Sequence, residues 1–147
     1  MMETVMKMIL PHRILNTVLL AVAIVAGMSS CGKKSAAEQL ESAMEQTQRR
    51  LPKPMGEEFV WVGARYDRAA NEILFEYTSH EPYELTEEQR AQLHGMMAGQ
   101  FLPSFEKDGE QVVSLIRKLR PDIHYVYRWE GDGHIWLDDT CQADEYL

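Results

Sequence analysis

The sequence predicts one α+β domain, in which a four-stranded antiparallel sheet carries two helices packed across one face. Two observations predict it. Stretches that alternate with a period of two residues come in two pairs, one before and one after a pair of amphipathic helical stretches. With 147 residues, 45% of them hydrophobic, the chain can build one modest core. Hairpins need no long crossover, so an N-terminal helix followed by ββ-αα-ββ is expected to form an all-antiparallel sheet.

The first expected element is a helix over residues 36–51, which are rich in Ala, Glu, Gln, Met and Arg and contain no Gly or Pro. Its apolar stripe is thin and consists of Leu40, Met44 and Leu51. Such a helix either docks on the domain through this narrow seam or stands away from it as a stalk. Pro52 and Pro54 end the segment. Residues 31–57 are therefore assigned to a tether and helix, and residues 58–141 to the α+β domain.

The first hairpin is expected from residues 58–66 and 72–78, which are rich in Val, Phe, Trp, Ile and Tyr and are joined by a short polar loop. Thr86 and Gln89 then have the spacing of a capping box, which predicts the start of a helix that ends near Pro103.

A second helix is expected to begin at Asp108 and to stop before Pro121. Its apolar residues recur at intervals of three and four, the cleanest amphipathic stripe in the chain. They are Val112, Leu115, Ile116 and Leu119.

Residues 123–130 and 134–141 predict the second hairpin, closed by a turn at Gly131, Asp132 and Gly133. Residues 142–147 are expected to be a flexible acidic tail.

The N-terminus predicts export. Lys7 and Arg13 precede an apolar run of about 15 residues, too short for the roughly 20 that cross a bilayer, so residues 1–30 are interpreted as a signal peptide. The run ends in Met28, Ser29, Ser30, Cys31 and Gly32.

These residues resemble the lipobox of bacterial lipoproteins, although that family most often has Leu where Met28 stands. The resemblance implies that Cys31 carries diacylglycerol, that signal peptidase II cuts before it, and that the mature protein is a membrane-anchored lipoprotein facing the periplasm or the cell surface. The alternative is an ordinary signal peptide with an incidental cysteine.

The charge of the chain excludes a broad basic surface. Removing Lys7, Arg13 and Glu3 with the signal peptide changes the net charge from −8 to −9. Nucleic acid is therefore not an expected partner. Like-charge repulsion from anionic lipid means that acyl chains on Cys31 must provide the anchor.

The last quarter of the chain loosely resembles small bacterial envelope lipoproteins of unassigned function, in which an aromatic YxYxxxGxG hairpin ends in a cysteine. The matching residues are Tyr125, Tyr127, Gly131, Gly133 and Cys141. Members of that group often carry a partner cysteine in the preceding helix. This chain has no cysteine between Cys31 and Cys141, so such a disulfide is absent.

Both faces of the expected hairpins carry apolar side chains, whereas helices can cover only one face of a sheet. An aromatic second face would have to meet the N-terminal helix, another chain or a ligand. The candidate partner surface consists of Trp61, Tyr127, Trp129 and Trp136. The alternative is that aromatic residues simply suit half-buried strands. The expected function is a binding or assembly module that contacts a protein or another cell-envelope component.

A small envelope enzyme is the second hypothesis. His124 would lie across from Cys141 or from Asp139, depending on where the turn is centred. Neither pair has a third member or an oxyanion donor, so no catalytic residue is assigned. His80, His94, His124 and His134 are dispersed over the expected elements, and the sequence contains no HExxH or CxxC pattern and no nucleotide-binding loop. No metal and no cofactor is therefore expected.

Overall fold

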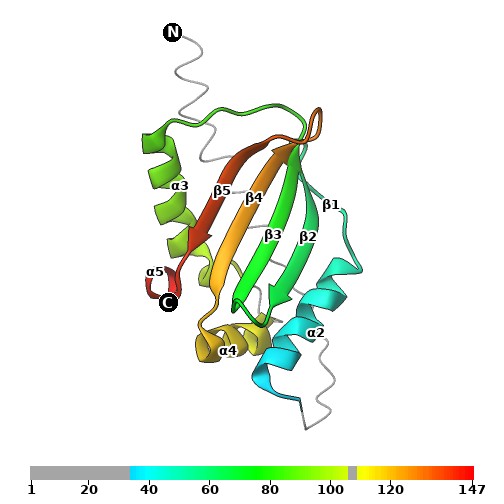
Figure 1. Cartoon of the computed structure of the whole chain (residues 1–147), viewed down its shortest axis with the longest axis vertical. Helices are drawn as coiled ribbons and strands as arrows, with labels where there is room; N and C mark the ends of the chain where they lie inside the picture. Colours follow the sequence, from blue (N-terminus) through cyan, green and yellow to red (C-terminus); the bar gives the residue numbers. More distant parts are fainter. Residues whose placement is uncertain (1–33, 106–108) are drawn as a thin grey trace.

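The computed structural model describes residues 34–105 and 109–147, so the expected signal peptide and Cys31 lie outside the described residues. One layer is a sheet and the other is a layer of helices (Figure 1). In chain order the elements are α2 (Ala36–Gln48), β1 (Lys53–Met55), β2 (Phe59–Asp67), β3 (Glu72–Ser79), α3 (Glu87–Gln100), a 3-10 turn (Leu102–Ser104), α4 (Glu110–Leu119), β4 (Asp122–Trp129), β5 (Ile135–Cys141) and α5 (Ala143–Tyr146).

The sheet of the described chain has five strands in the order β1-β2-β3-β4-β5, in which β3 and β4 are parallel. Both expected hairpins are confirmed as antiparallel pairs, β2 with β3 and β4 with β5. The expected all-antiparallel arrangement is wrong, although the α+β class is right. The reason is the connection through α3 and α4, which is long enough to return the chain to the starting end of β3, so that β4 runs parallel to β3.

Strand β1 was not expected, because Pro54 lies within it and Pro52 and Gly56 flank it. It pairs with the start of β2, Lys53 with Trp61 and Met55 with Phe59. Pro54 is tolerated because β1 lies at the edge of the sheet, where no neighbour needs its missing N–H. The domain therefore begins before the expected boundary at residue 58.

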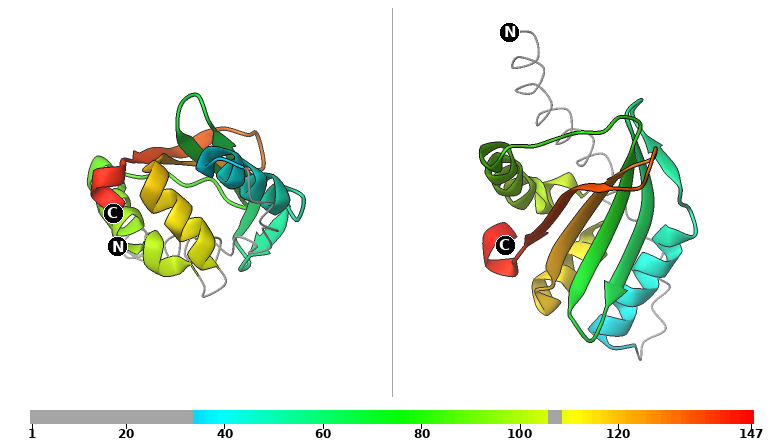
Figure 2. Two further views of the ribbon diagram at one scale, coloured as in Figure 1. Left: turned by 90° about the horizontal axis from the view of Figure 1, so that it is seen from below. Right: turned by 45° about the horizontal axis from the view of Figure 1, so that its top comes forward.

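Three helices, α2, α3 and α4, lie on the same side of the sheet (Figure 2). Helix α2 is docked rather than a stalk: Leu40, Ala43 and Met44 are fully buried against the sheet and α4. Its last residue, Gln48, also accepts a hydrogen bond from the backbone N–H of Ala64 at 2.8 Å and donates one to the carbonyl of Val62 at 3.2 Å. The Gln48 side chain therefore bonds the edge of β2 just beyond the residues that pair with β1.

Local signals placed the helix ends well. The capping box is confirmed, since Thr86 and Gln89 bond each other's backbone N–H groups. Helix α4 ends at Leu119 and is capped by Arg120, which has left-handed backbone angles and precedes Pro121. Its expected start at Asp108 lies outside the described residues.

The C-terminal residues are not a flexible tail. They form α5, and the Tyr146 side chain is buried, with its hydroxyl donating to the Pro121 carbonyl at 2.6 Å. Its ring meets Phe101 edge-on, with 5.2 Å between centroids. The C-terminal residues are ordered because the Tyr146 ring, near the end of the chain, is buried in the core.

Candidate functional site

The expected aromatic partner surface is not a surface. Trp61 and Tyr127 are 1% exposed and Trp136 is 4% exposed, while Trp129 is half-buried and donates its indole N–H to the His80 carbonyl. The prediction is wrong because these side chains point to the face that the helices cover. Tyr127, for example, stacks on the ring of Tyr77 with 4.5 Å between centroids.

A β-bulge explains why Trp136 lies in the core. Tyr127 pairs with Leu137 but the next residue, Arg128, pairs with Ile135, so β5 has one extra residue at this point. Trp136 and Leu137 are both buried as a result. The indole N–H of Trp136 donates to the buried hydroxyl of Ser79 at 2.9 Å.

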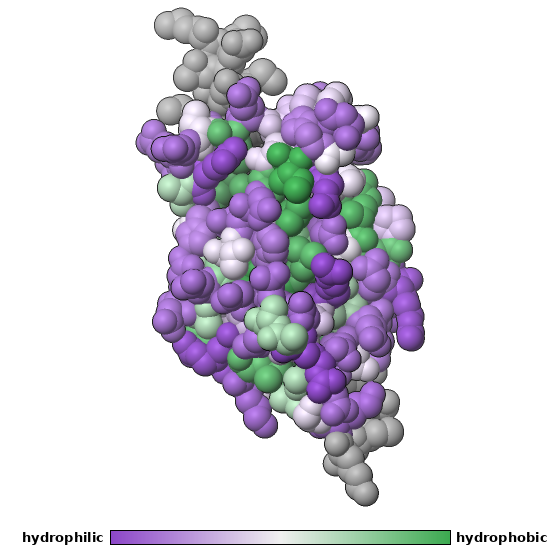
Figure 3. Space-filling model, viewed as in Figure 1, coloured by the Kyte–Doolittle hydropathy of each residue, from purple (hydrophilic) through white to green (hydrophobic). Residues whose placement is uncertain are grey.

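The opposite face of the sheet carries no helix of the described chain (Figure 2). Its side chains alternate with the core residues along each strand and include Val60, Leu74, Val126 and Ile135. Ile135 is 45% exposed. Figure 3, viewed onto this face, shows hydrophobic groups among polar ones. We call this surface the open face.

Charged side chains on the open face are mostly paired. Arg128 donates to Glu76 at 2.8 Å. His124 lies between two carboxylates, with Nδ1 3.1 Å from Glu72 and Nε2 2.5 Å from Asp138. Burial alone would lower the pKa of His124, but the hydrogen bonds to Asp138 and Glu72 outweigh it and raise that pKa.

The expected pairing of His124 with Cys141 or Asp139 is therefore wrong. His124 lies opposite Thr140. Near the turn, Arg128 pairs with Ile135, and this register continued along the strands would place Asp139 opposite His124. The bulge shifts the register of the rest of the hairpin by one residue, and a shift of one residue moves the side chains of a strand to the other face of the sheet. Asp139 and Cys141 consequently point to the helix-covered side.

There they meet a histidine that the sequence reasoning did not select. His94 of α3 places Nδ1 2.8 Å from Asp139 Oδ2 and 3.9 Å from Cys141 Sγ. The Cys141 sulfur also lies 4.0 Å from Asp139 Oδ2. The three donor atoms lie within 4.8 Å of one another. The histidines of the described residues are dispersed as expected, but His94 meets other side chains that can bind a metal.

Glu145 completes this cluster, since its carboxylate contacts Nε2 of His94. The hydrogen bond to Glu145, opposed by burial and assisted by Asp139, raises the pKa of His94. Burial, with a further contribution from Asp139 and Glu145, raises the pKa of Cys141 to about 12. A thiol with so high a pKa is neutral at neutral pH, and a neutral thiol is a poor nucleophile.

One signal in the sequence could have found part of this cluster. Asp139 and Cys141 are two residues apart on one strand, so their side chains share a face. Nothing local connects them to His94, which is 45 residues from Asp139 along the chain. Only the packing of α3 beside β5 and α5 brings the three donors together.

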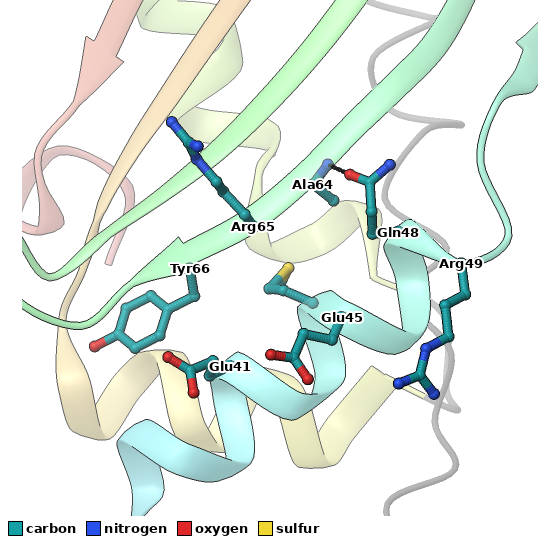
Figure 4. Close-up of a pocket in the computed structure, with 8 residues that line it drawn as sticks. Glu41, Glu45, Gln48, Arg49, Ala64, Arg65 and Tyr66 are labelled. Atoms are coloured by element: carbon teal, nitrogen blue, oxygen red, sulfur yellow. Dashed lines mark hydrogen bonds between the residues drawn. The ribbon is translucent and has the colours of Figure 1, made fainter.

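A hollow lies between α2 and the edge of β2 (Figure 4). It has a volume of about 480 Å³, and its lining includes Glu41 and Glu45 from α2 and Arg65 and Tyr66 from β2. The Gln48 amide, bonded to Ala64, closes one end. Its carboxylates are within reach of solvent, and no nucleophile or metal-ligand set lies beside them among its lining residues.

Comparisons with known proteins bear on the fold. No protein-family model matches the sequence, and a search of curated proteins found no relative. A solved structure with a similar fold is a protein of Pseudomonas aeruginosa that is provisionally described as secreted. The match has a TM-score of 0.52 at 10% identity and covers 76% of this chain and 93% of that one. It shows a shared fold.

Among the described helices, none is both long and apolar enough to cross a membrane.

Proposed function

We propose that the protein is a lipid-anchored protein of the bacterial cell envelope, facing the periplasm or the cell surface, and that it binds a protein partner through the open face. The observation that carries the proposal is that helices cover one side of the sheet while the other side keeps apolar side chains among its polar ones, with Ile135 45% exposed. Val126 is buried on this face, and Val60 and Leu74 are half-buried. A sheet face that no helix covers and that exposes an apolar side chain is a candidate for protein contact.

The charge of this face favours a basic partner. The open face carries five carboxylates and two arginines, with His124 held between two of the carboxylates, so acidic groups are in excess on it, on a mature chain of net charge −9. The carboxylates are those of Asp67, Glu72, Glu76, Asp122 and Asp138, and the arginines are Arg65 and Arg128. We therefore infer a partner whose contact surface carries apolar and basic side chains.

The anchor rests on the lipobox resemblance at Cys31. The fold likeness to a protein described as secreted agrees with export. Two or more acyl chains hold a protein stably at a membrane, whereas one chain binds reversibly.

Binding is favoured over catalysis by the placement of the candidate residues. His124 lies on the open face between Glu72 and Asp138, away from the cysteine that an enzyme would need beside it. Cys141 is buried and has a raised pKa.

The anchor is tested by intact mass and membrane fractionation of the natively expressed protein, with Cys31→Ala as the control. A membrane-bound species that starts at Cys31 and carries acyl mass supports the anchor. A soluble, unacylated wild type refutes it.

The open face is tested by a photo-crosslinking residue in living cells, placed at Ile135 and, as a control, at Gln92, which is exposed on α3. A second protein crosslinked from position 135 alone supports the proposal. Ile135→Lys should then weaken capture, because a basic partner is repelled. Equal crosslinking from both positions, none from position 135, or a crosslink only to a second copy of the chain refutes it.

A further inference from the structure

The cluster of His94, Asp139 and Cys141 is independent of the open face and supplies a thiol, an imidazole and a carboxylate at one point of the fold. We propose that these three side chains bind one divalent transition metal ion of the zinc class, with Glu145 orienting the imidazole and a fourth coordination position open to solvent.

The distances are close to those of a tetrahedral site. With metal bonds of about 2.3 Å to sulfur and 2.0–2.2 Å to nitrogen and oxygen, tetrahedral donors lie about 3.4–3.6 Å apart. The cluster has 2.8 Å between His94 and Asp139, and 3.9 Å and 4.0 Å from these atoms to the Cys141 sulfur. Shifts of roughly half an ångström, within the reach of small side-chain rotations, would make the three separations equal.

The identity of the donors selects the class of ion. Calcium and magnesium take oxygen ligands, so a thiolate and an imidazole disfavour them. Zinc binds cysteine, histidine and carboxylate ligands together. Structural zinc sites have four protein ligands, whereas a site with three protein ligands keeps its fourth position for water or another exchangeable ligand.

The contact between Glu145 and His94 is a second, independent indication. A metal-bound histidine almost always gives its other ring N–H to a carboxylate or carbonyl, which sets the ring orientation. Here Nδ1 faces Asp139 and Cys141, while Nε2 faces Glu145. Glu145 is itself held, because its other oxygen accepts the backbone N–H of Gln142 at 2.9 Å. Glu145 is thus a positioning residue and not a ligand.

The site is accessible while its sulfur is protected. The side chains of His94 and Asp139 are 28% and 24% exposed, so an ion can enter from solvent. Cys141 is 1% exposed, which shields the thiol from other thiols and from oxidants. The ligands come from α3 and β5, and Glu145 lies on α5. A bound ion would therefore stabilise the packing of α3 and the C-terminal helix against the sheet.

Zinc binding by the full chain tests the proposal, using the Cys31→Ala background so that Cys141 is the single thiol. The chelator-treated protein is titrated with Zn²⁺ by calorimetry and with Co²⁺ by absorption, which reports thiolate coordination. The expected result is one ion per chain, a thiolate-to-Co²⁺ absorption band, and a higher unfolding temperature with Zn²⁺ present.

Single substitutions assign the ligands. Cys141→Ser and Asp139→Asn should each weaken Zn²⁺ binding at least about 100-fold, and Glu145→Gln about 10- to 100-fold with the stoichiometry unchanged. The matched control is His124→Gln, because His124 also lies between two carboxylates but has no thiol beside it. It should bind Zn²⁺ like the parent.

Several results would overturn the proposal of a metal site. They are the absence of saturable Zn²⁺ binding by folded protein, binding unchanged by Cys141→Ser, equal loss in His124→Gln, and equal affinity for Ca²⁺ or Mg²⁺. Circular dichroism checks that each variant folds. If Cys141→Ser does not fold, the partly exposed Asp139→Asn decides, and unchanged binding there also overturns the proposal.

Discussion

Three buried tyrosines make one stability prediction unusual in sign. The hydroxyl groups of Tyr77, Tyr125 and Tyr127 are buried and have no hydrogen-bond partner in the part of the chain that the structure describes. Burying a hydroxyl without a partner costs roughly 1–3 kcal/mol. Replacing Tyr127 by phenylalanine removes that cost and keeps the ring.

The ring contacts show that little else is lost. Tyr127 stacks on Tyr77 at 4.5 Å and packs against Trp136 at 5.1 Å and Phe59 at 5.8 Å, all between ring centroids. Phenylalanine preserves these contacts. We expect Tyr127→Phe to raise the free energy of unfolding by about 1–2 kcal/mol, and the melting temperature by roughly 3–5 °C per kcal/mol.

Tyr146→Phe is the matched control with the opposite expectation. Its hydroxyl donates to the Pro121 carbonyl at 2.6 Å, so its removal should lower the free energy of unfolding by about 1 kcal/mol. Urea unfolding followed by tryptophan fluorescence measures both variants, with an unchanged m-value as the condition for comparing them. If Tyr127→Phe is destabilised as much as Tyr146→Phe, the Tyr127 hydroxyl has a partner and the reasoning fails.

Two further predictions concern polar contacts between distant segments. Asn71→Ala should lower the free energy of unfolding by about 2 kcal/mol, because the Asn71 amide donates to the Leu119 carbonyl at 2.8 Å and accepts from the Tyr66 hydroxyl at 2.7 Å. A decrease of less than about 0.5 kcal/mol, measured by urea unfolding, contradicts this prediction. The raised pKa of His124 means that its protonation stabilises the fold below about pH 6.5, and this contribution is lost as pH rises through the higher folded-state pKa. Unfolding measured from pH 5 to 9 should show a larger loss of stability in the wild type than in His124→Gln, which keeps the contribution of His94, whose pKa is also raised. Identical pH profiles of the two proteins would contradict a contribution from His124.

The placement of helices and strands follows from short-range patterns in the sequence. The capping box at Thr86, the stop at Pro121 and the two hairpins all depend on residues a few positions apart. Such signals act within one element or turn, so they survive whatever the rest of the chain does. Strand β1 and helix α5 are exceptions. Pro54 is compatible with a strand only at an edge, and α5 depends on the burial of Tyr146 in the core.

The sequence by itself thus determined the α+β class, the order of the main elements and the exclusion of a broadly basic surface. Tertiary structure decided the direction of β4 against β3, the side of the sheet on which the aromatic rings lie, and the meeting of His94 with Asp139 and Cys141. Each depends on contacts between residues far apart in the chain. A single bulge at Tyr127 was enough to move Asp139 and Cys141 away from His124, because side chains alternate between faces with every residue.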